Sequence, residues 1–168
     1  MLKELIKQKE KDNKALSKEF ESWLNKNRGR QIKDIEYFLK KRSKNIDNLI
    51  VQAAIFGNLH KINAFGIFCV GGYGRQELHP FSDIDLLLLT KKELSEEEQK
   101  KVEKFVSTLW DLGLEVGHSV RTIEQAKTQA RDDLYTMTNM LEFRKIFGPE
   151  ILYAEYQKIL ETKNLWRS

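Results

Sequence analysis

The sequence has few of the residues that support disulfide-bonded or turn-rich folds. Its 168 residues include one cysteine, Cys69, which excludes an internal disulfide framework and any zinc site built from several cysteines. Nine glycines and two prolines are too few for a turn-rich β-sandwich and favour long helices. No apolar run approaches the ~18 residues that a membrane-spanning helix needs, and the charged N-terminus, Met1-Leu2-Lys3-Glu4, lacks the apolar segment of a signal peptide. We therefore expect a cytoplasmic protein with no membrane partner.

Positive charge is in excess only in the first part of the chain. Residues 1–60 carry 14 Lys and Arg against 8 Asp and Glu, a charge of +6, whereas the other 108 residues carry 15 against 17, a charge of −2. A basic segment can indicate a nucleic-acid partner. Here acidic residues alternate with the lysines on segments that resemble amphipathic helices, which favours a solvated helix surface. We therefore do not expect nucleic acid as a partner, and the oligomeric state has no signature in the sequence.

Residues 1–60 predict an N-terminal helical segment. Apolar residues recur at i, i+3 and i+4, the spacing that places them on one side of a helix. Asn27-Arg28-Gly29 separates an early helix from a second helix over about 31–57, which Gly57-Asn58 ends. The apolar stripes comprise Phe20, Trp23 and Leu24; Ile35, Phe38 and Leu39; and Ile46, Leu49, Ile50 and Ala53.

From residue 64 the pattern changes to short apolar strands. A strand over 64–70 runs into Gly71-Gly72, and a short helical turn broken by Pro80 is expected over 76–82. A second strand over 83–90 contains four consecutive leucines, which indicates burial on both faces, as in the centre of an α/β sheet.

A third strand, over 114–121, alternates between apolar and polar residues. Glu115 and Arg121 lie on its polar face, whereas Val116, His118 and Val120 lie on the apolar face. We therefore expect His118 to be a buried core histidine rather than a ligand. His79, beside Pro80, is expected to be a turn residue.

Helices are expected around these strands. Ser95 and Glu98 form a capping box at the start of one helix, and Gly113 ends it. Another helix starts at Thr122, restarts near Asp132-Asp133, and carries Leu134, Met137, Leu141 and Phe147 on its apolar side; a last helix covers about 150–162. These elements predict an α+β fold with three parts: a helical segment over 1–60, a core over 61–149 and a C-terminal helical region over 150–168.

Two acidic residues on one strand carry the strongest chemical signal. In Ser82-Asp83-Ile84-Asp85 the two carboxylates point to the same face, because strand side chains alternate. Two adjacent carboxylates repel each other, and a divalent cation between them removes that repulsion. Hard oxygen ligands suit Mg²⁺, which completes its coordination with water and substrate phosphate. A solvated strand end is the alternative interpretation of the Asp-x-Asp pattern.

A glycine turn precedes this acidic pair. Gly71 and Gly72 let backbone N–H groups approach an anion closely, and Arg75 can form charge-assisted bonds to phosphate. Eleven residues separate Gly72 from Asp83, so adjacent strands can bring the two features together. A plain turn is the alternative. Together the features predict phosphoryl or nucleotidyl transfer, with Glu115 as the candidate third metal carboxylate or, alternatively, an exposed strand residue.

The residues of these motifs also resemble a known family. The segments Gly71-Gly72-Tyr73-Gly74-Arg75, Glu77-Leu78-His79-Pro80 and Ser82-Asp83-Ile84-Asp85-Leu86-Leu87, continued by residues 109–122, are similar to the nucleotidyltransferase domain of the bacterial bifunctional PII uridylyltransferase/uridylyl-removing enzymes. The similarity covers roughly residues 35–160. Gln76 departs from it, because the family usually has glycine there.

The resemblance implies a polymerase-β-like nucleotidyltransferase fold over residues 61–149, with a small mixed sheet flanked by helices. It implies Mg²⁺-dependent transfer of UMP from UTP to a tyrosine of the PII nitrogen-regulatory protein, with release of pyrophosphate. Asp83 and Asp85 would hold metal, with Glu115 as the candidate third ligand, while Gly71, Gly72, Arg75 and Ser82 would meet the nucleotide. The uridylyl-removing and glutamine-sensing domains of the family lie outside this sequence, so neither activity is expected from this chain alone.

Two other functions compete with this one. The first is a stand-alone nucleotidyltransferase with another acceptor, such as an antibiotic or an antitoxin partner. The second is a remnant that binds nucleotide or a partner without turnover. The long similarity after Trp110 disfavours the former, and the retained pair Asp83 and Asp85 disfavours the latter.

Overall fold

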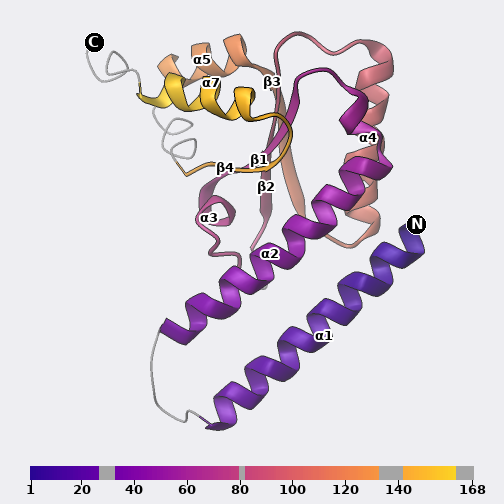
Figure 1. Ribbon diagram of the computed structural model, residues 1–168, viewed down its shortest axis with the longest axis vertical. Coiled ribbons are helices and arrows are strands. Elements are labelled where there is room, and N and C mark those ends of the chain that lie inside the picture. The colour runs from indigo at the N-terminus through magenta and orange to yellow at the C-terminus, as the bar shows by residue number, and fades with distance from the viewer. Residues whose placement is uncertain (27–32, 80–81, 133–141, 162–168) are drawn as a thin grey trace.

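A computed structural model describes residues 1–26, 33–79, 82–132 and 142–161, and it has the mixed α+β fold that the sequence predicts (Figure 1). A four-stranded sheet has helices on both faces. In chain order the elements are α1 (Leu2–Lys26), α2 (Lys33–Phe56), the 3-10 turn η1 (Leu59–Lys61), β1 (Phe65–Cys69), α3 (Gly71–Gly74), β2 (Ile84–Thr90), α4 (Glu96–Asp111), β3 (Val116–Thr122), α5 (Ile123–Asp132), β4 (Arg144–Phe147) and α7 (Glu150–Glu161).

The strands lie in the order β3-β2-β1-β4. β2 pairs parallel with β3, whereas β1 pairs antiparallel with both β2 and β4. The leucine-rich β2 is therefore central, and Leu86 to Leu89 are all buried. This burial is the outcome that the uninterrupted apolar run predicts.

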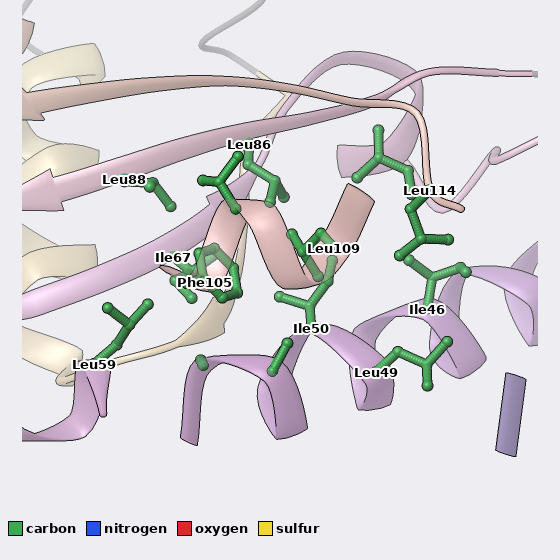
Figure 2. Packing of buried hydrophobic residues seen from close by; sticks show 14 of the residues in the cluster. Ile46, Leu49, Ile50, Leu59, Ile67, Leu86, Leu88, Phe105, Leu109 and Leu114 are labelled. Carbon is green, nitrogen blue, oxygen red and sulfur yellow. The ribbon is translucent and has the colours of Figure 1, made fainter. Parts of the chain in front are cut away.

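Alternate residues of β2 enter two different cores. Leu86 and Leu88 face α2 and α4, whereas Leu87 and Leu89 face α5 and α7. Figure 2 shows the first core, in which Ile46, Leu49 and Ile50 of α2 pack beneath the sheet. The second helix of the N-terminal segment thus shares its core with the sheet.

Helix α4 confirms the predicted start, apolar face and end. The Ser95 hydroxyl accepts a hydrogen bond from the Glu98 N–H at 3.3 Å, and the Glu98 carboxylate accepts one from the Ser95 N–H at 2.9 Å. Gly113 follows the helix at φ 67°, in the left-handed region that glycine adopts readily. The buried face comprises Val102, Phe105, Val106, Thr108 and Leu109.

Two predictions of secondary structure are wrong. The short helix lies at Gly71–Gly74, before the predicted range 76–82. The helix predicted from Thr122 is described over Ile123–Asp132, but Phe147, which was predicted on its apolar side, lies in strand β4. The sequence of β4, two charged residues followed by two apolar ones, does not alternate and therefore does not predict a strand. Leu134, Met137 and Leu141 lie outside the described residues.

His118 also differs from expectation. It is exposed on β3 rather than buried, and its ring lies 6.3 Å from the ring of Trp110, edge-on. β3 is an edge strand, so its apolar face is only partly covered by α4; Val120 on the same face is 41% exposed.

Cys69 is fully buried in β1, as expected for an inert thiol. Burial raises the pKa of its thiol to about 12, which keeps it protonated near neutral pH. Among the helices described by the structure, none has the length and apolar character needed to cross a membrane.

Candidate functional site

Three strand ends meet at one end of the sheet, and they carry the residues singled out in the sequence. The Val70 N–H, directly before the glycine turn, donates to the Asp85 carbonyl at 3.2 Å. The Ile84 N–H donates to the Glu115 carbonyl at 2.9 Å. The glycine turn, the acidic pair and Glu115 are therefore adjacent in space, although 44 residues of sequence separate the first from the last (Gly71 and Glu115).

The acidic pair lies at the start of β2. Asp83 directly precedes the strand and Asp85 is its second residue; both side chains are exposed at the surface. Partial burial, together with the negative charge of Asp83, raises the pKa of the Asp85 carboxyl above its ordinary value. The two carboxylates thus repel each other in the absence of a cation.

Gly117 of β3 creates the space that the Asp85 carboxylate occupies. It pairs with Asp85 across the parallel strands, and a Cβ atom built at Gly117 would lie 2.9 Å from Asp85 Oδ1. Any side chain at this position would push the carboxylate away. The sequence analysis did not single out Gly117, whose role depends on a register between strands that sequence alone does not fix.

The glycine turn presents bare backbone beside this pair. Gly71 has φ 60°, a conformation that L side chains rarely adopt, and no atom outside its chain neighbours lies within 4 Å of a Cβ built there. The nearest atom to a Cβ built on Gly72 is Arg75 Nη2 at 3.7 Å. Gly71 and Gly72 form the first turn of α3, whose N–H groups have no partner within the helix. The turn can therefore approach an anion closely.

Close contacts and backbone conformation restrict which residues fit at Gly74 and at position 76. A Cβ on Gly74 would lie 1.7 Å from the Glu142 carbonyl oxygen, so only glycine fits there. Gln76 has φ 61°, in the left-handed region that disfavours any residue except glycine. Glycine adopts this conformation without strain, so Gln76 carries a conformational cost that glycine would avoid.

Arg75 is held by two carboxylates at the edge of the turn. Its Nε donates to Glu77 at 2.7 Å, and its Nη1 pairs with Glu142. These hydrogen bonds raise the pKa of Arg75 above its ordinary value. The Arg75 side chain is nevertheless 44% exposed, and its guanidinium lies against Gly72, within reach of a ligand on the turn.

A network with little exposure to solvent anchors the turn from the opposite side. The Tyr73 hydroxyl donates to Asp47 Oδ1 of α2 at 2.6 Å. Arg144 of β4 binds the same carboxylate through two hydrogen bonds of 2.7 and 3.0 Å, and its guanidinium lies 5.5 Å from the centre of the Tyr73 ring. Burial, with the Asp47 charge, raises the pKa of the Tyr73 hydroxyl well above its ordinary value. The sequence analysis missed this network.

Ser82 and Glu115 line a polar cavity of about 440 Å³ beside the strand ends. Lys9, Asn13 and Arg42 from the two N-terminal helices form its opposite wall. Glu115 is exposed and lies one residue before β3 rather than within it. Among the described residues, no three His, Cys, Asp or Glu side chains converge closely enough to hold a metal ion.

The acidic pair fits a divalent cation. Mg²⁺ binds through one or two carboxylates and takes its remaining ligands from water and phosphate. Asp83 and Asp85 supply two hard oxygen donors whose mutual repulsion a cation would relieve. A third protein ligand is therefore not required, and the metal role of Glu115 stays a prediction.

Comparison with known proteins identifies the family of the chain. The family profile described as "Nucleotidyltransferase domain" matches residues 49–138, so the chain belongs to the nucleotidyltransferase domain family. Among curated relatives, the bifunctional uridylyltransferase/uridylyl-removing enzyme of Nitrosococcus oceani is 42% identical over 123 residues, which is 73% of this chain and 14% of the relative. The enzymes of the same name from Pseudomonas putida W619 and Pseudomonas syringae pv. tomato are 41% and 39% identical, each over 84% of this chain and 16% of their own length.

These matches confirm the family resemblance in the sequence. The chain is a nucleotidyltransferase domain homologous to that of the bifunctional uridylyltransferase/uridylyl-removing enzymes. It spans about one sixth of the length of the relatives it matches.

Proposed function

We propose that this chain transfers UMP from UTP to a tyrosine of a PII protein, with release of pyrophosphate, in the bacterial cytoplasm. The observation that carries the proposal is the hydrogen bond from Val70 to Asp85, which fixes the glycine turn beside the acidic pair. The similarity to enzymes named as uridylyltransferases supports uridine as the base.

The site residues fall into two groups, those that would bind the triphosphate and those that would bind the metal ion. The backbone N–H groups of Gly71 and Gly72 would bind phosphate oxygens, and Arg75 would add a charged donor at the edge of the turn. Ser82 would contact the nucleotide from the start of β2. Asp83 and Asp85 would hold Mg²⁺, which when bound supplies neutralising charge for the triphosphate and the departing pyrophosphate.

The reaction itself exchanges the phosphoanhydride bond between the α- and β-phosphates of UTP for a phosphodiester bond to tyrosine. The tyrosine oxygen forms a bond to the α-phosphorus as the bond from that phosphorus to the bridging oxygen of pyrophosphate breaks, and the phenolic proton is released to solvent. The contribution of the chain is to hold the triphosphate against the carboxylates in a fixed orientation. The Asp47–Tyr73–Arg144 network would maintain that orientation by holding the turn.

The experiment that tests the proposal is transfer of labelled UMP from UTP to a PII protein by the purified chain in the presence of Mg²⁺. We expect label on a PII tyrosine, equimolar release of pyrophosphate, and no label when EDTA replaces Mg²⁺. ATP, CTP and GTP serve as matched controls for base preference. Absence of labelling by a folded chain that binds Mg²⁺ and UTP would refute the proposal.

A second prediction concerns the space beside Asp85. We expect Gly117→Ala to lower kcat roughly 10- to 100-fold, because a displaced carboxylate no longer has the required geometry. Ser119→Ala, on the same face of β3 two residues further on, is the matched control and should leave kcat unchanged. Thermal unfolding of both variants should resemble that of the wild type, since the Asp85 side chain can move. Equal kcat values for the two variants would show that Gly117 does not position Asp85.

A further inference from the structure

The two edge strands of the sheet, β3 and β4, differ in how well they are protected from pairing with another chain (Figure 1). Strand β4 has only four residues, contains Lys145, and pairs with β1 in an irregular register. Short edge strands, lysines and bulges are features by which proteins prevent such pairing. Strand β3 has seven residues in continuous register with β2, and it contains neither lysine nor proline. The edge next to the acidic strand therefore lacks this protection.

The outward main-chain groups of β3 belong to alternate residues. In a parallel ladder, a residue whose carbonyl bonds to one neighbouring strand directs both of its main-chain groups there, and the next residue directs both to the other side. The Glu115 carbonyl faces β2, because it accepts a hydrogen bond from the Ile84 N–H at 2.9 Å. The even-numbered residues of β3 therefore face outward, and the Val116 carbonyl accordingly accepts from Trp110 Nε1 of α4 at 3.4 Å.

Two residues in the middle of β3 keep their outward groups available. At the end of the strand, the outward Thr122 N–H donates to Gln125 Oε1 at 2.9 Å. Among the residues that the structure describes, none pairs with the outward N–H and C=O groups of His118 and Val120. We call these groups the open edge. Both side chains are exposed, so an extended segment could lie along this edge and pair with these groups.

The open edge lies beside the Asp85 carboxylate. Gly117 pairs with Asp85, and Asp85 Oδ1 lies 2.9 Å from the position of a Cβ built on Gly117. Since neighbouring strands are about 4.8 Å apart, this carboxylate leans over β3, toward the open edge. Gly117 itself places no side chain between the carboxylate and a strand added at that edge.

We propose that the open edge binds the acceptor protein as an added strand, with the tyrosine that receives UMP opposite Gly117. This inference rests on the proposed function. The glycine turn follows β1, and β1 and β3 flank β2 on opposite sides. A triphosphate on the turn would direct its pyrophosphate away from β3, while the tyrosine oxygen would approach the α-phosphorus from the side of β3. In-line displacement requires this arrangement of the attacking and leaving oxygens.

A cavity beside the open edge would accept a second side chain of the added segment. It measures about 350 Å³, and its lining includes His118 and Val120 of β3 and Val102 and Glu103 of α4. Alternate residues of a strand point to opposite faces, so a direct neighbour of the tyrosine would point toward α4 and this cavity. Strand addition combines main-chain hydrogen bonds with such side-chain pockets. The site therefore suits a polypeptide acceptor rather than a small molecule.

Amide hydrogen exchange tests the proposal with the unmodified chain. It is followed residue by residue by NMR, with and without a PII protein and in the absence of UTP, so that no transfer occurs. Binding of PII should slow exchange of the His118 and Val120 amides about tenfold or more, because both gain acceptors. The amides of Gly117 and Ser119 face β2 and are the internal control, so their exchange should change much less.

Two substitutions at one position isolate the contribution of the main chain. His118→Pro removes an outward N–H but no bond to β2, and proline is tolerated at such edge positions. His118→Val also removes the imidazole but keeps the N–H, so it is the matched control. We expect the KM for PII to be about tenfold higher in the proline variant than in the valine variant, with equal KM values for UTP. Thermal unfolding measures whether both variants fold.

The outcomes separate this inference from the proposed function. No PII binding by the wild type, PII binding without slower exchange at the open edge, or equal KM values for PII in two folded variants overturns the open edge as the acceptor site. Slower exchange that follows chain concentration in the absence of PII also overturns it, and assigns the edge to a second copy. Slower exchange on PII binding, without UMP transfer by the wild type, supports the open edge and refutes the proposed activity instead. If the proline variant does not fold, the exchange measurement decides.

Discussion

Asp83→Asn and Asp85→Asn should each lower UMP transfer to PII by about 10³-fold or more, with the fold intact. Each substitution removes one of two carboxylate donors to the cation and replaces it with a neutral amide, and losing a metal contact in the transition state costs several kcal/mol. Both side chains are exposed, so neither change opens a cavity. The measurement is the rate of label transfer at saturating UTP and Mg²⁺.

Measuring the thermal stabilisation by Mg²⁺ and UTP tests whether the loss of activity comes from loss of metal binding. Mg²⁺ with UTP should raise the thermal unfolding temperature of the wild type, since a ligand that binds only the folded state stabilises it. That rise should shrink in both Asp variants. In the absence of Mg²⁺, neither variant should be less stable than the wild type, because removing one charge relieves the repulsion between the two carboxylates, which adds to partial burial in raising the pKa of Asp85.

Two further variants complete the series. Asp111→Asn, an exposed residue at the end of α4, is the control and should retain full activity. Glu115→Gln tests the predicted third ligand: a loss as large as that of the Asp variants would support a metal role. Wild-type rates in both Asp83→Asn and Asp85→Asn would show that the acidic pair holds no catalytic metal.

The features that were predictable from the sequence depend on neighbouring residues. The acidic pair needs only the two-residue period of a strand, and the α4 capping box needs only Ser95 and Glu98 three residues apart. The buried central strand follows from its run of leucines. Each pattern spans a few residues, so no knowledge of distant contacts is required.

The features that were missed depend on contacts between distant segments. The helical turn at Gly71–Gly74 contradicts the low helix propensity of glycine, and the Glu142 backbone approaches Gly74 too closely for any side chain there. The exposure of His118 follows from the position of β3 at the edge of the sheet, which alternation along the strand does not reveal. The space at Gly117 likewise depends on strand register.

The Asp47 network is the most consequential of these distant contacts, because it joins the N-terminal helical segment to the glycine turn. Asp47 precedes Tyr73 by 26 residues and Arg144 by 97, so no local pattern indicates the contact. The side chains of Asp47 and Arg144 are only 19% and 25% exposed. Helix α2 therefore contacts the glycine turn directly, although it lies outside the glycine and Asp motifs.

Asp47→Ala should consequently lower both stability and use of UTP. Removing one partner of a largely buried ion pair leaves Arg144 uncompensated, at a cost of about 2–3 kcal/mol in the free energy of unfolding. The turn also loses the acceptor for the Tyr73 hydroxyl, so the KM for UTP should rise roughly tenfold, with the KM for PII unchanged. Chemical denaturation and steady-state kinetics measure the two effects.

Two matched variants distinguish the effect of the network on the orientation of the turn from its effect on the stability of the fold. Tyr73→Phe removes the hydroxyl but keeps the Asp47–Arg144 pair, so it should cost only about 1 kcal/mol in stability, while still raising the KM for UTP. Glu155→Ala breaks a partly exposed ion pair with Lys91 and should change neither quantity appreciably. An Asp47→Ala chain that is destabilised but keeps the wild-type KM for UTP would limit the network to a structural role. A raised KM in Tyr73→Phe at nearly full stability would instead establish that α2 orients the phosphate-binding turn.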